Sequence, residues 1–430
     1  MELTIAVDGA AQPAVSRTFS RSGQPTFREV FGVTEFRALW LAQLLSVAGD
    51  QLARVAMTVL VFDRTHSALW TALTYAVTFL PWVIGGLALS GLADRLPRRQ
   101  VMVACDLART VLVCLMALVS LKVASAAALW TMVALLFVVT LLDSPFKSAR
   151  SAMLPDVLSA ERYVLGTAIT QTTLQVGMVS GFALGGVVVA VVGVRAALLA
   201  DAATFATSAV LVRLWVRQRP ATAHPAADSR SPFAEMVAGV RLVFGDRMLR
   251  TLMLLGWLVA FYVVPMGLAA PYAATFHASL AIPVSTGLVF AAAPFGTALG
   301  AVVLGRLVPH AWRQRLIGPL AIATCGLLLL CWLHPGLAGA LLIVAGSGTC
   351  ASYQLAANAA FVAAVPPERR GQAFGLANGG MQVTQGIWIV LAGAAVSSNV
   401  ISPATAVAIS GGLGAAVAVA LATSWHRQAA

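Results

Sequence analysis

Two opposite charges one helical turn apart interrupt an otherwise apolar stretch near the start of the chain. In "SVAGDQLARVA", residues 46–56, Asp50 and Arg54 are four positions apart, which places them on one face of a helix. Insertion of a charged side chain at the centre of a membrane helix costs about 2.5–3.5 kcal/mol, so such residues usually face a bundle interior or a cavity. The pair therefore indicates either a permanent structural ion pair or a site that exchanges a proton or a cationic ligand.

The same face of this segment carries further polar side chains. At about 100° per residue, Gln43, Ser46, Asp50, Arg54 and Thr58 fall within a stripe of about 120°. Burial opposes ionisation of a carboxyl group, whereas a neighbouring arginine favours it. Asp50 can therefore exchange protons near neutral pH only if Arg54 moves away in one state. We expect the two residues to couple proton movement to a conformational change, with a fixed structural pair as the alternative.

Composition indicates which elements hold these residues. The 430 residues are 59% hydrophobic and 10% charged, with a mean hydropathy of +0.87, whereas soluble domains carry about 25% charged residues. The apolar runs are long enough to span a bilayer as helices, and they do not alternate as the strands of a membrane β-barrel do. The net charge of +12 falls mainly between these runs, which favours a role in membrane topology over nucleic-acid binding. The chain is predicted to be an all-α membrane protein.

Twelve apolar segments are predicted to be transmembrane helices, six in each half of the chain. They cover residues 36–62, 69–90, 101–121, 127–143, 163–192, 196–216, 251–276, 284–308, 316–334, 337–364, 372–398 and 403–425. The expected order is an N-terminal tail (1–35), a six-helix half (36–216), a linker with an amphipathic helix (217–250), a second six-helix half (251–425) and a C-terminal tail (426–430). The tail of residues 1–35 lacks the pattern of a cleaved signal peptide.

Positive charge predicts the orientation in the membrane. With both termini on one side, the loops on the opposite side hold only Arg64, Lys122 and Arg195, and Arg54 and Arg109 lie within helices. Arginine and lysine accumulate in cytoplasmic loops. We therefore expect a multi-pass protein of the cell (inner) membrane with both termini and the central linker in the cytoplasm.

The loop between the second and third predicted helices reads "SGLADRLPRRQVM", residues 90–102. It resembles the signature loop of the major facilitator superfamily, Gly-x-x-x-Asp-Arg-x-Gly-Arg-Arg, at the same place in the topology, although two glycines of that signature are absent. The matching positions are Asp94, Arg95, Arg98 and Arg99. The resemblance implies that these residues form a conformational latch between the two halves on the cytoplasmic side.

The fifth predicted helix contains "GMVSGFALGG", with Gly177, Gly181, Gly185 and Gly186. Glycines four residues apart let helices approach closely in membranes. The pattern is also similar to the antiporter motif of the same superfamily, Gly-x-x-x-Gly-Pro-x-x-Gly-Gly, with Phe182 at the proline position. That resemblance favours export over uptake.

Further stretches resemble one branch of this superfamily, the twelve-helix bacterial drug/proton antiporters related to enterobactin and multidrug exporters. These are "GDQLARVAMTVLVFDRT", "SARSAMLPDVLSAER" and "DAATFATSA". The resemblance implies a secondary active transporter in which the proton gradient drives efflux of a small amphipathic or hydrophobic compound, such as a drug, an antibiotic or a siderophore. Metabolite uptake or facilitated diffusion, and a non-transporting membrane sensor with the same fold, are the alternatives.

The resemblance also implicates polar residues on the helices that surround the family's central cavity. The expected substrate contacts are Gln43, Ser46, Trp257, Tyr262, Gln354 and Asn358. Asp106 and Arg109, three residues apart, are expected to form a structural pair. Asp143 and Asp201 fall near predicted helix ends, where a charge costs less.

No pattern indicates an enzyme. The six histidines are scattered and the five cysteines fall inside apolar runs, so neither a metal site nor a disulfide framework is predicted. A phosphate-binding loop is absent from the sequence, so direct use of ATP is not expected. The predicted partners are a small-molecule substrate, protons and the lipid bilayer, without nucleic acid or a cofactor. We expect a monomer with the proton gradient as its energy source.

Overall fold

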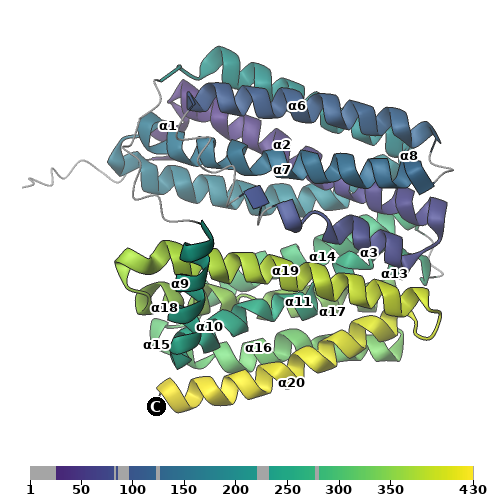
Figure 1. Ribbon diagram of the computed structural model, residues 1–430, viewed down its shortest axis with the longest axis vertical. Coiled ribbons are helices and arrows are strands. Elements are labelled where there is room, and N and C mark those ends of the chain that lie inside the picture. Colours follow the sequence, from purple (N-terminus) through teal and green to yellow (C-terminus); the bar gives the residue numbers. More distant parts are fainter. Residues whose placement is uncertain are drawn as a thin grey trace, which may run out of the picture.

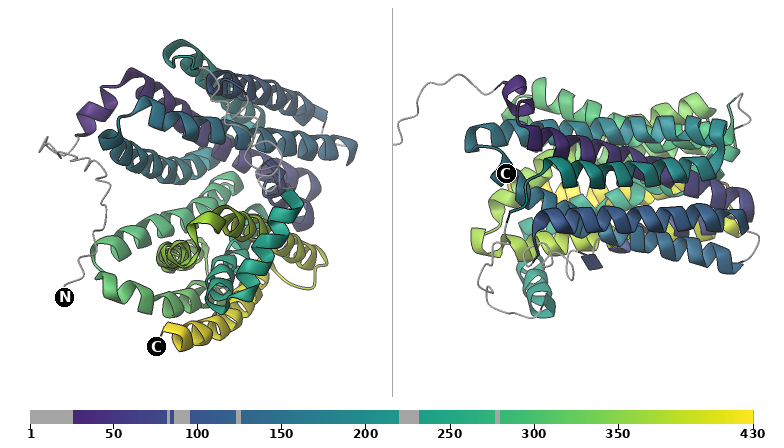
Figure 2. Two further views of the ribbon diagram at one scale, coloured as in Figure 1. Left: turned by 60° about the vertical axis from the view of Figure 1, so that its left-hand side comes forward. Right: turned by 90° about the horizontal axis from the view of Figure 1, so that it is seen from above.

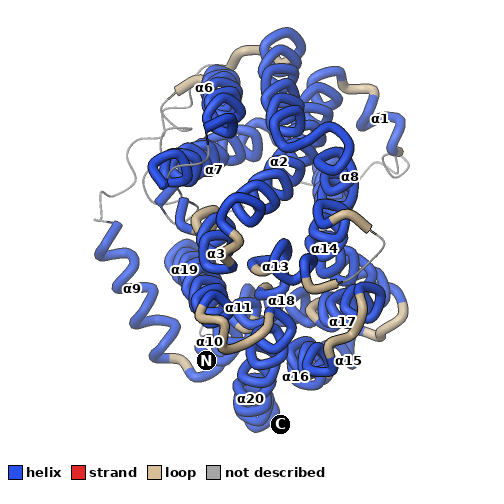
Figure 3. Tube along the Cα trace, turned by 90° about the vertical axis from the view of Figure 1, so that its right-hand side faces the viewer, coloured by secondary structure: helices blue, strands red, loops and turns tan. Residues whose placement is uncertain are grey.

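Helices provide the regular secondary structure of this chain. The computed structural model describes residues 26–81, 84–85, 96–122, 126–219, 232–276 and 280–429, and these residues contain α-helices and short 3-10 helices but no strand (Figure 3). The all-α prediction is confirmed.

The N-terminal half is built from long helices that match the predicted apolar segments. Its longest element, α8, runs through two predicted spans, and Gly193 inside it has a φ of 80°. This left-handed conformation favours glycine because the residue lacks a Cβ, and it marks the turn between the two spans. The elements are α1 (Phe27–Phe31), α2 (Thr34–Thr65), α3 (Ala68–Ala76), α6 (Arg98–Val119), η1 (Ser120–Lys122), α7 (Ala126–Val157) and α8 (Ala160–Trp215).

The C-terminal half follows the same plan with more interruptions. The segment predicted as one helix over residues 251–276 is divided into several short helices, with Pro265 and Pro271 inside it, because proline removes a helical hydrogen bond. The elements are α9 (Pro232–Gly245), α10 (Arg247–Trp257), α11 (Val259–Tyr262), α12 (Val264–Gly267), α13 (Ala269–Ala274), α14 (Ile282–Arg306), α15 (His310–Arg315), α16 (Ile317–Gly326), η2 (Leu327–Leu333), α17 (Leu337–Cys350), α18 (Tyr353–Ala364), η3 (Pro367–Arg369), α19 (Arg370–Ser397) and α20 (Pro403–Ala429).

Nine helices in the described part of the chain are long and apolar enough to cross a membrane. One of them is the 56-residue α8, and a shorter apolar helix covers Ile317–Leu333. The predicted second span, 69–90, is described only in part. The count of twelve therefore stays a prediction. The predicted linker helix corresponds to α9, which packs against α10 and α19.

The two halves form separate groups of helices (Figures 1 and 2). Near the start of α2 each half has its own apolar core, one around Ala42 and Met102 and the other around Leu252 and Phe361. Near the end of α2 a single apolar core contains side chains from both halves. The halves are thus joined at one end of the molecule.

Close contacts between helices hold the joined end together. The Ser67 and Ser397 hydroxyls lie 3.3 Å apart, and the backbone N–H of Leu69 donates to the Ser397 hydroxyl at 2.7 Å. The Phe182 ring of α8 stacks on Phe290 of α14, with their centroids 4.9 Å apart. Helix α3 packs against α19, and α8 against α14 (Figure 3). These contacts close the space between the halves at that end.

Candidate functional site

Arg109 of α6 lies at the centre of a buried charge cluster in the N-terminal half. Its side chain is only 1% exposed, and its Nη2 donates to Asp50 Oδ1 of α2 at 2.7 Å. Its Nη1 lies 3.8 Å from Asp106 and 3.9 Å from Asp143. Because a buried guanidinium without anionic partners would cost several kcal/mol, these three carboxylates account for its stability inside the bundle.

This geometry corrects the expected pairing of Asp50 with Arg54. Among the described residues, Arg54 forms no ion pair, and Asp50 bonds to Arg109 instead. The physical reason is burial: Arg109 is almost completely enclosed and needs a charge partner, whereas Arg54 is only half-buried and remains partly solvated. Arg54 still lines the same small cavity as Asp50 and Arg109.

The other members of the cluster are held by short local contacts. Lys147 Nζ lies 2.6 Å from Asp143, and the Ser208 hydroxyl donates to Asp106 at 2.6 Å. The Arg109 guanidinium lies 3.9 Å from the centroid of the Phe205 ring, which adds a cation–π contact. The sequence-predicted pair of Asp106 and Arg109 thus belongs to a larger network.

Asp143 and Asp201 lie deeper in the N-terminal half, beside the charge cluster, than their positions near predicted helix ends suggested. They are 4% and 1% exposed, and both line a cavity of about 20 Å³ together with Asp50, Arg54 and Arg109. A cavity of this volume holds about one water molecule. The sequence did contain a signal for this site, since four separate apolar segments each carry an intramembrane charge.

Asp201 is the least compensated acid of the cluster. The partner recorded for its carboxylate among the described residues is the Thr204 hydroxyl, at 3.5 Å. A Cβ at Gly49 of α2 would overlap this carboxylate and that hydroxyl, so the glycine allows α8 to approach here.

The glycines of the antiporter-like motif pack against two different helices. Gly177, Gly181 and Gly185 lie against α2, over Val47, Gln51 and Leu52 respectively. Gly186 lies against the backbone of α14. The first three therefore allow close packing within the N-terminal half, and Gly186 allows close packing between the halves.

Two of the predicted cavity residues in the C-terminal half are in contact. Gln354 Nε2 of α18 donates to the Tyr262 hydroxyl at 2.8 Å. Trp257 lies apart from this pair, with its Nε1 donating to the Ala377 carbonyl at 2.9 Å and its ring against Gly380 of α19. Asn358 is exposed.

The predicted cavity residues of α2 have different surroundings. The Ser46 hydroxyl accepts a hydrogen bond from Arg109 at 3.3 Å, so Ser46 belongs to the charge cluster. Gln43 is 4% exposed, and within the described part of the chain neither its amide oxygen nor its amide nitrogen has a hydrogen-bond partner. A buried amide of this kind is available to a ligand or a water molecule.

The predicted latch is described only in part. Asp94 and Arg95 lie outside the described residues. Arg98 Nη1 donates to Asp156 at 2.6 Å and to the Ala152 carbonyl at 2.8 Å, and Arg99 Nη2 donates to the Arg213 carbonyl at 2.6 Å. These contacts join α6 to α7 and α8 within one half.

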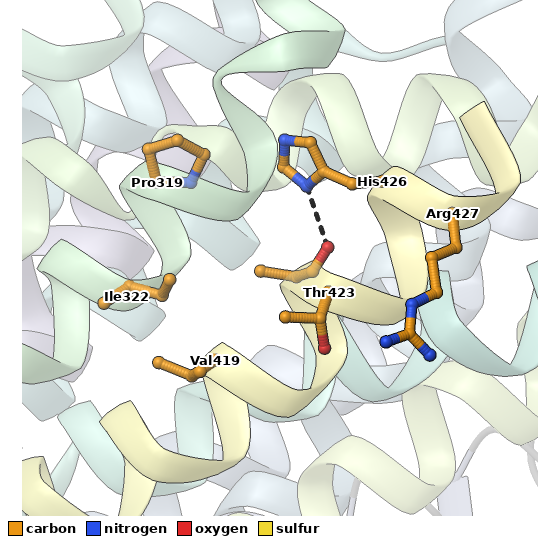
Figure 4. A pocket seen from close by; sticks show the side chains of 7 residues that line it. Pro319, Ile322, Val419, Thr423, His426 and Arg427 are labelled. Carbon is orange, nitrogen blue, oxygen red and sulfur yellow. Dashed lines mark hydrogen bonds between the residues drawn. The ribbon is translucent and has the colours of Figure 1, made fainter. Parts of the chain in front are cut away.

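A separate groove of about 410 Å³ lies between α16 and α20 (Figure 4). Pro319 and Ile322 line one side, and Thr423, His426 and Arg427 line the other. His426 Nδ1 lies 2.8 Å from the Ala422 carbonyl. The groove shares no lining residue with the charge cluster.

Comparison with known proteins agrees with the fold. The chain is 31% identical to the "Enterobactin exporter EntS" of Salmonella choleraesuis (strain SC-B67) over 300 residues, which cover 68% of this chain and 67% of that protein. It is also 31% identical over 307 residues to the exporter of the same name from Citrobacter koseri (strain ATCC BAA-895 / CDC 4225-83 / SGSC4696), with 68% and 67% of the two chains covered.

Solved structures share the fold at low sequence identity. The nucleoside transporter NupG superposes with a TM-score of 0.70 at 13% identity, with 91% of this chain and 98% of that chain covered. A bacterial homologue of the lysosomal transporter Spinster, in an inward-facing and occupied conformation, superposes with a TM-score of 0.69 at 16% identity, covering 91% and 95%. The family model described as Major Facilitator Superfamily matches residues 39–353. On this match, the chain belongs to the major facilitator superfamily.

Proposed function

We propose that this protein exports a small amphipathic compound across the inner membrane in exchange for protons, and that the charge cluster around Arg109 carries the protons. The observation that carries this proposal is the gathering of four aspartates around one buried arginine: Asp106, Asp143 and Asp201 are buried, and Asp50 is partly exposed. Charged groups are expensive at this depth unless they are paired, and in membrane proteins they mark ion and proton pathways.

The coupling requires that the ion pairs of the cluster change between states. In the present arrangement the closest described cation to Asp50 is Arg109, through the 2.7 Å contact. If Arg109 shifts toward Asp143 or Asp106, Asp50 loses its closest cation and binds a proton more readily. Arg54, which lines the same cavity, is a second cation that Asp50 can pair with in another state. Proton release and uptake would thus follow the movement of α6 relative to α2.

The export direction rests on orientation and on relatives. The positive-inside rule places the chain termini in the cytoplasm, so the joined end of the two halves would face outward and the separate cores would face the cytoplasm. Cytoplasmic substrate would then reach the space between the halves. Relatives named as enterobactin exporters support efflux of siderophore-like compounds, and the polar pair Tyr262–Gln354 would contribute to substrate binding.

The test is transport in proteoliposomes with an imposed pH gradient, using a panel of drugs and siderophores. We expect the wild-type protein to accumulate at least one compound against its gradient. Asp50→Asn should lose this proton-driven accumulation while it retains exchange of labelled for unlabelled substrate, because exchange does not require net proton movement. Proton-driven accumulation at the wild-type rate in Asp50→Asn would exclude Asp50 as a coupling residue. Absence of gradient-dependent movement for every compound would favour a non-transporting role.

A further inference from the structure

A second cavity in the N-terminal half is lined by a partly buried arginine that forms no ion pair with another described residue. This cavity has a volume of about 100 Å³ and lies between α2, α7 and α8. Arg150 of α7 lines it, and its Nε is buried without a hydrogen-bond partner among the described residues. The Thr167 hydroxyl of α8 lines the same cavity and is also buried without a partner. We call this cavity the Arg150 pocket.

Two acids close in sequence to the pocket residues are paired with other cations, and Glu161, two residues before Tyr163 in the wall, forms no ion pair with a described residue. Glu35, next to Phe36 in the wall, lies 2.8 Å from Arg219. Asp156, two residues after Leu154 in the wall, lies 2.6 Å from Arg98. Asp143 on the same helix as Arg150 is shared by Lys147 and Arg109. The described ion pairs therefore leave Arg150 without a carboxylate.

The lining of the pocket contains no aspartate or glutamate. Arg150 is only partly buried, but its Nε is buried and has no hydrogen-bond partner among the described residues, so this donor is available to an anionic ligand. Thr167 adds a hydroxyl donor, and Gln171 adds an amide at the exposed side of the pocket. Arginine and hydroxyl donors together match a planar oxyanion such as a carboxylate.

Aromatic rings form the rest of the wall. Phe36 and Trp40 of α2 line the pocket together with Tyr163 of α8. The Phe36 and Trp40 rings are held in place, since both make edge contacts with Phe31, at centroid distances of 5.6 and 5.2 Å. Trp40 Nε1 also donates to the Thr173 hydroxyl at 2.7 Å. Fixed aromatic walls favour a flat aromatic ring over a flexible chain.

We propose that the Arg150 pocket binds an aromatic acid, with the carboxylate on Arg150 and Thr167 and the ring beside Trp40 and Tyr163. The pocket volume is several times the space that one water molecule needs, and the exposed Tyr163 and Gln171 leave it open to ligand from one side. This inference rests on the proposed export function only in naming the substrate class; binding itself requires neither a proton gradient nor the charge cluster.

The test is binding of sodium benzoate to the full chain, purified in a neutral detergent, by calorimetric titration, with benzyl alcohol as the uncharged counterpart. Loss of the charged contact should weaken benzoate binding about ten- to hundredfold in Arg150→Gln and leave benzyl alcohol binding unchanged. Thr167→Val should weaken benzoate binding severalfold. The matched control is Arg306→Gln, at an exposed arginine in the other half, which should bind benzoate as the wild type does.

Thermal unfolding separates a ligand site from a structural arginine. Because Arg150 is partly solvated and forms no ion pair with a described residue, Arg150→Gln without ligand should unfold close to the wild-type temperature, and benzoate should stabilise only proteins that retain Arg150. Equal benzoate affinity in wild type and Arg150→Gln, or no benzoate binding to the wild type, would overturn the inference. If Arg150→Gln fails to fold, equal benzoate affinity in Thr167→Val and wild type overturns it instead.

Two further outcomes assign the pocket or the function differently. Stabilisation of the wild type, but not of Arg150→Gln, by phosphatidylglycerol nanodiscs without any benzoate effect would assign the pocket to a lipid headgroup and refute the aromatic-acid ligand. Arg150-dependent benzoate binding in a protein that shows no proton-driven efflux would leave this site established and reject only the proposed export. Proton-driven efflux without benzoate binding would reject only this site.

Discussion

The choice of Arg109 rather than Arg54 as the partner of Asp50 can be measured with two double-mutant cycles. In the first cycle Asp50→Asn is combined with Arg109→Gln, and in the second it is combined with Arg54→Gln. The unfolding free energy of the purified full chain is measured for each variant in mixed micelles. The two cycles differ only in the arginine. They compare an arginine on a neighbouring helix, Arg109, with an arginine on the same helix as Asp50, Arg54.

The structure sets the expected magnitudes. Asp50→Asn removes one short charged contact of 2.7 Å but leaves Arg109 near Asp106 and Asp143. This single substitution should therefore lower the free energy of unfolding by about 1.5–3 kcal/mol. Arg109→Gln leaves three carboxylates, two of them buried, without their shared cation, and it should lower the free energy of unfolding by about 3–5 kcal/mol. The coupling energy of Asp50 with Arg109 should therefore be about 1.5–3 kcal/mol.

The cycle with Arg54 serves as the control. Arg54 is half-buried and forms no ion pair with a described residue, so its coupling to Asp50 should be below about 0.5 kcal/mol. A larger coupling with Arg54 than with Arg109 would refute the pairing argued here, and would support a proton site confined to α2.

Three further predictions concern the contacts between helices. Gly186→Ala should lower stability and slow transport, because the added Cβ would lie 2.5 Å from the Pro283 carbonyl oxygen at the crossing of α8 and α14. The control is Gly305→Ala, whose Cβ would meet no atom within 4 Å. It should behave as the wild type in the same melting and flux assays. Cysteines at Ser67 and Ser397, whose hydroxyls are 3.3 Å apart, should crosslink on oxidation and stop flux, and reduction should restore it; continued flux after complete crosslinking would show that this end does not open. Arg98→Ala, which removes the 2.6 Å contact with Asp156, should reduce the maximal flux severalfold with little change in substrate affinity, and a loss of affinity at normal maximal flux would contradict a conformational role.

Local features of the sequence predict the kind of protein and the position of most helices. Length and hydropathy decide whether a segment can span a bilayer, and both are local properties, so α2, α6, α14 and α20 lie where the apolar runs predicted them. The role of the motif glycines in helix packing could likewise be predicted from the sequence, because close packing depends on small residues at a fixed spacing. The helices against which they pack could not be predicted, since Gly177 packs against α2 and Gly186 against α14.

The packing of the helices against each other sets which charged side chains form ion pairs. Spacing along one helix favoured Asp50 and Arg54, but Asp50 bonds to Arg109, a residue 59 positions away. The energy of an ion pair depends on distance and on burial, and both are set by how helices pack against each other. For the same reason the sequence could not show that Asp201 is buried beside the cluster or that Arg150 lacks a carboxylate. Local hydropathy thus defined the helices, and packing between helices defined the candidate proton and ligand sites.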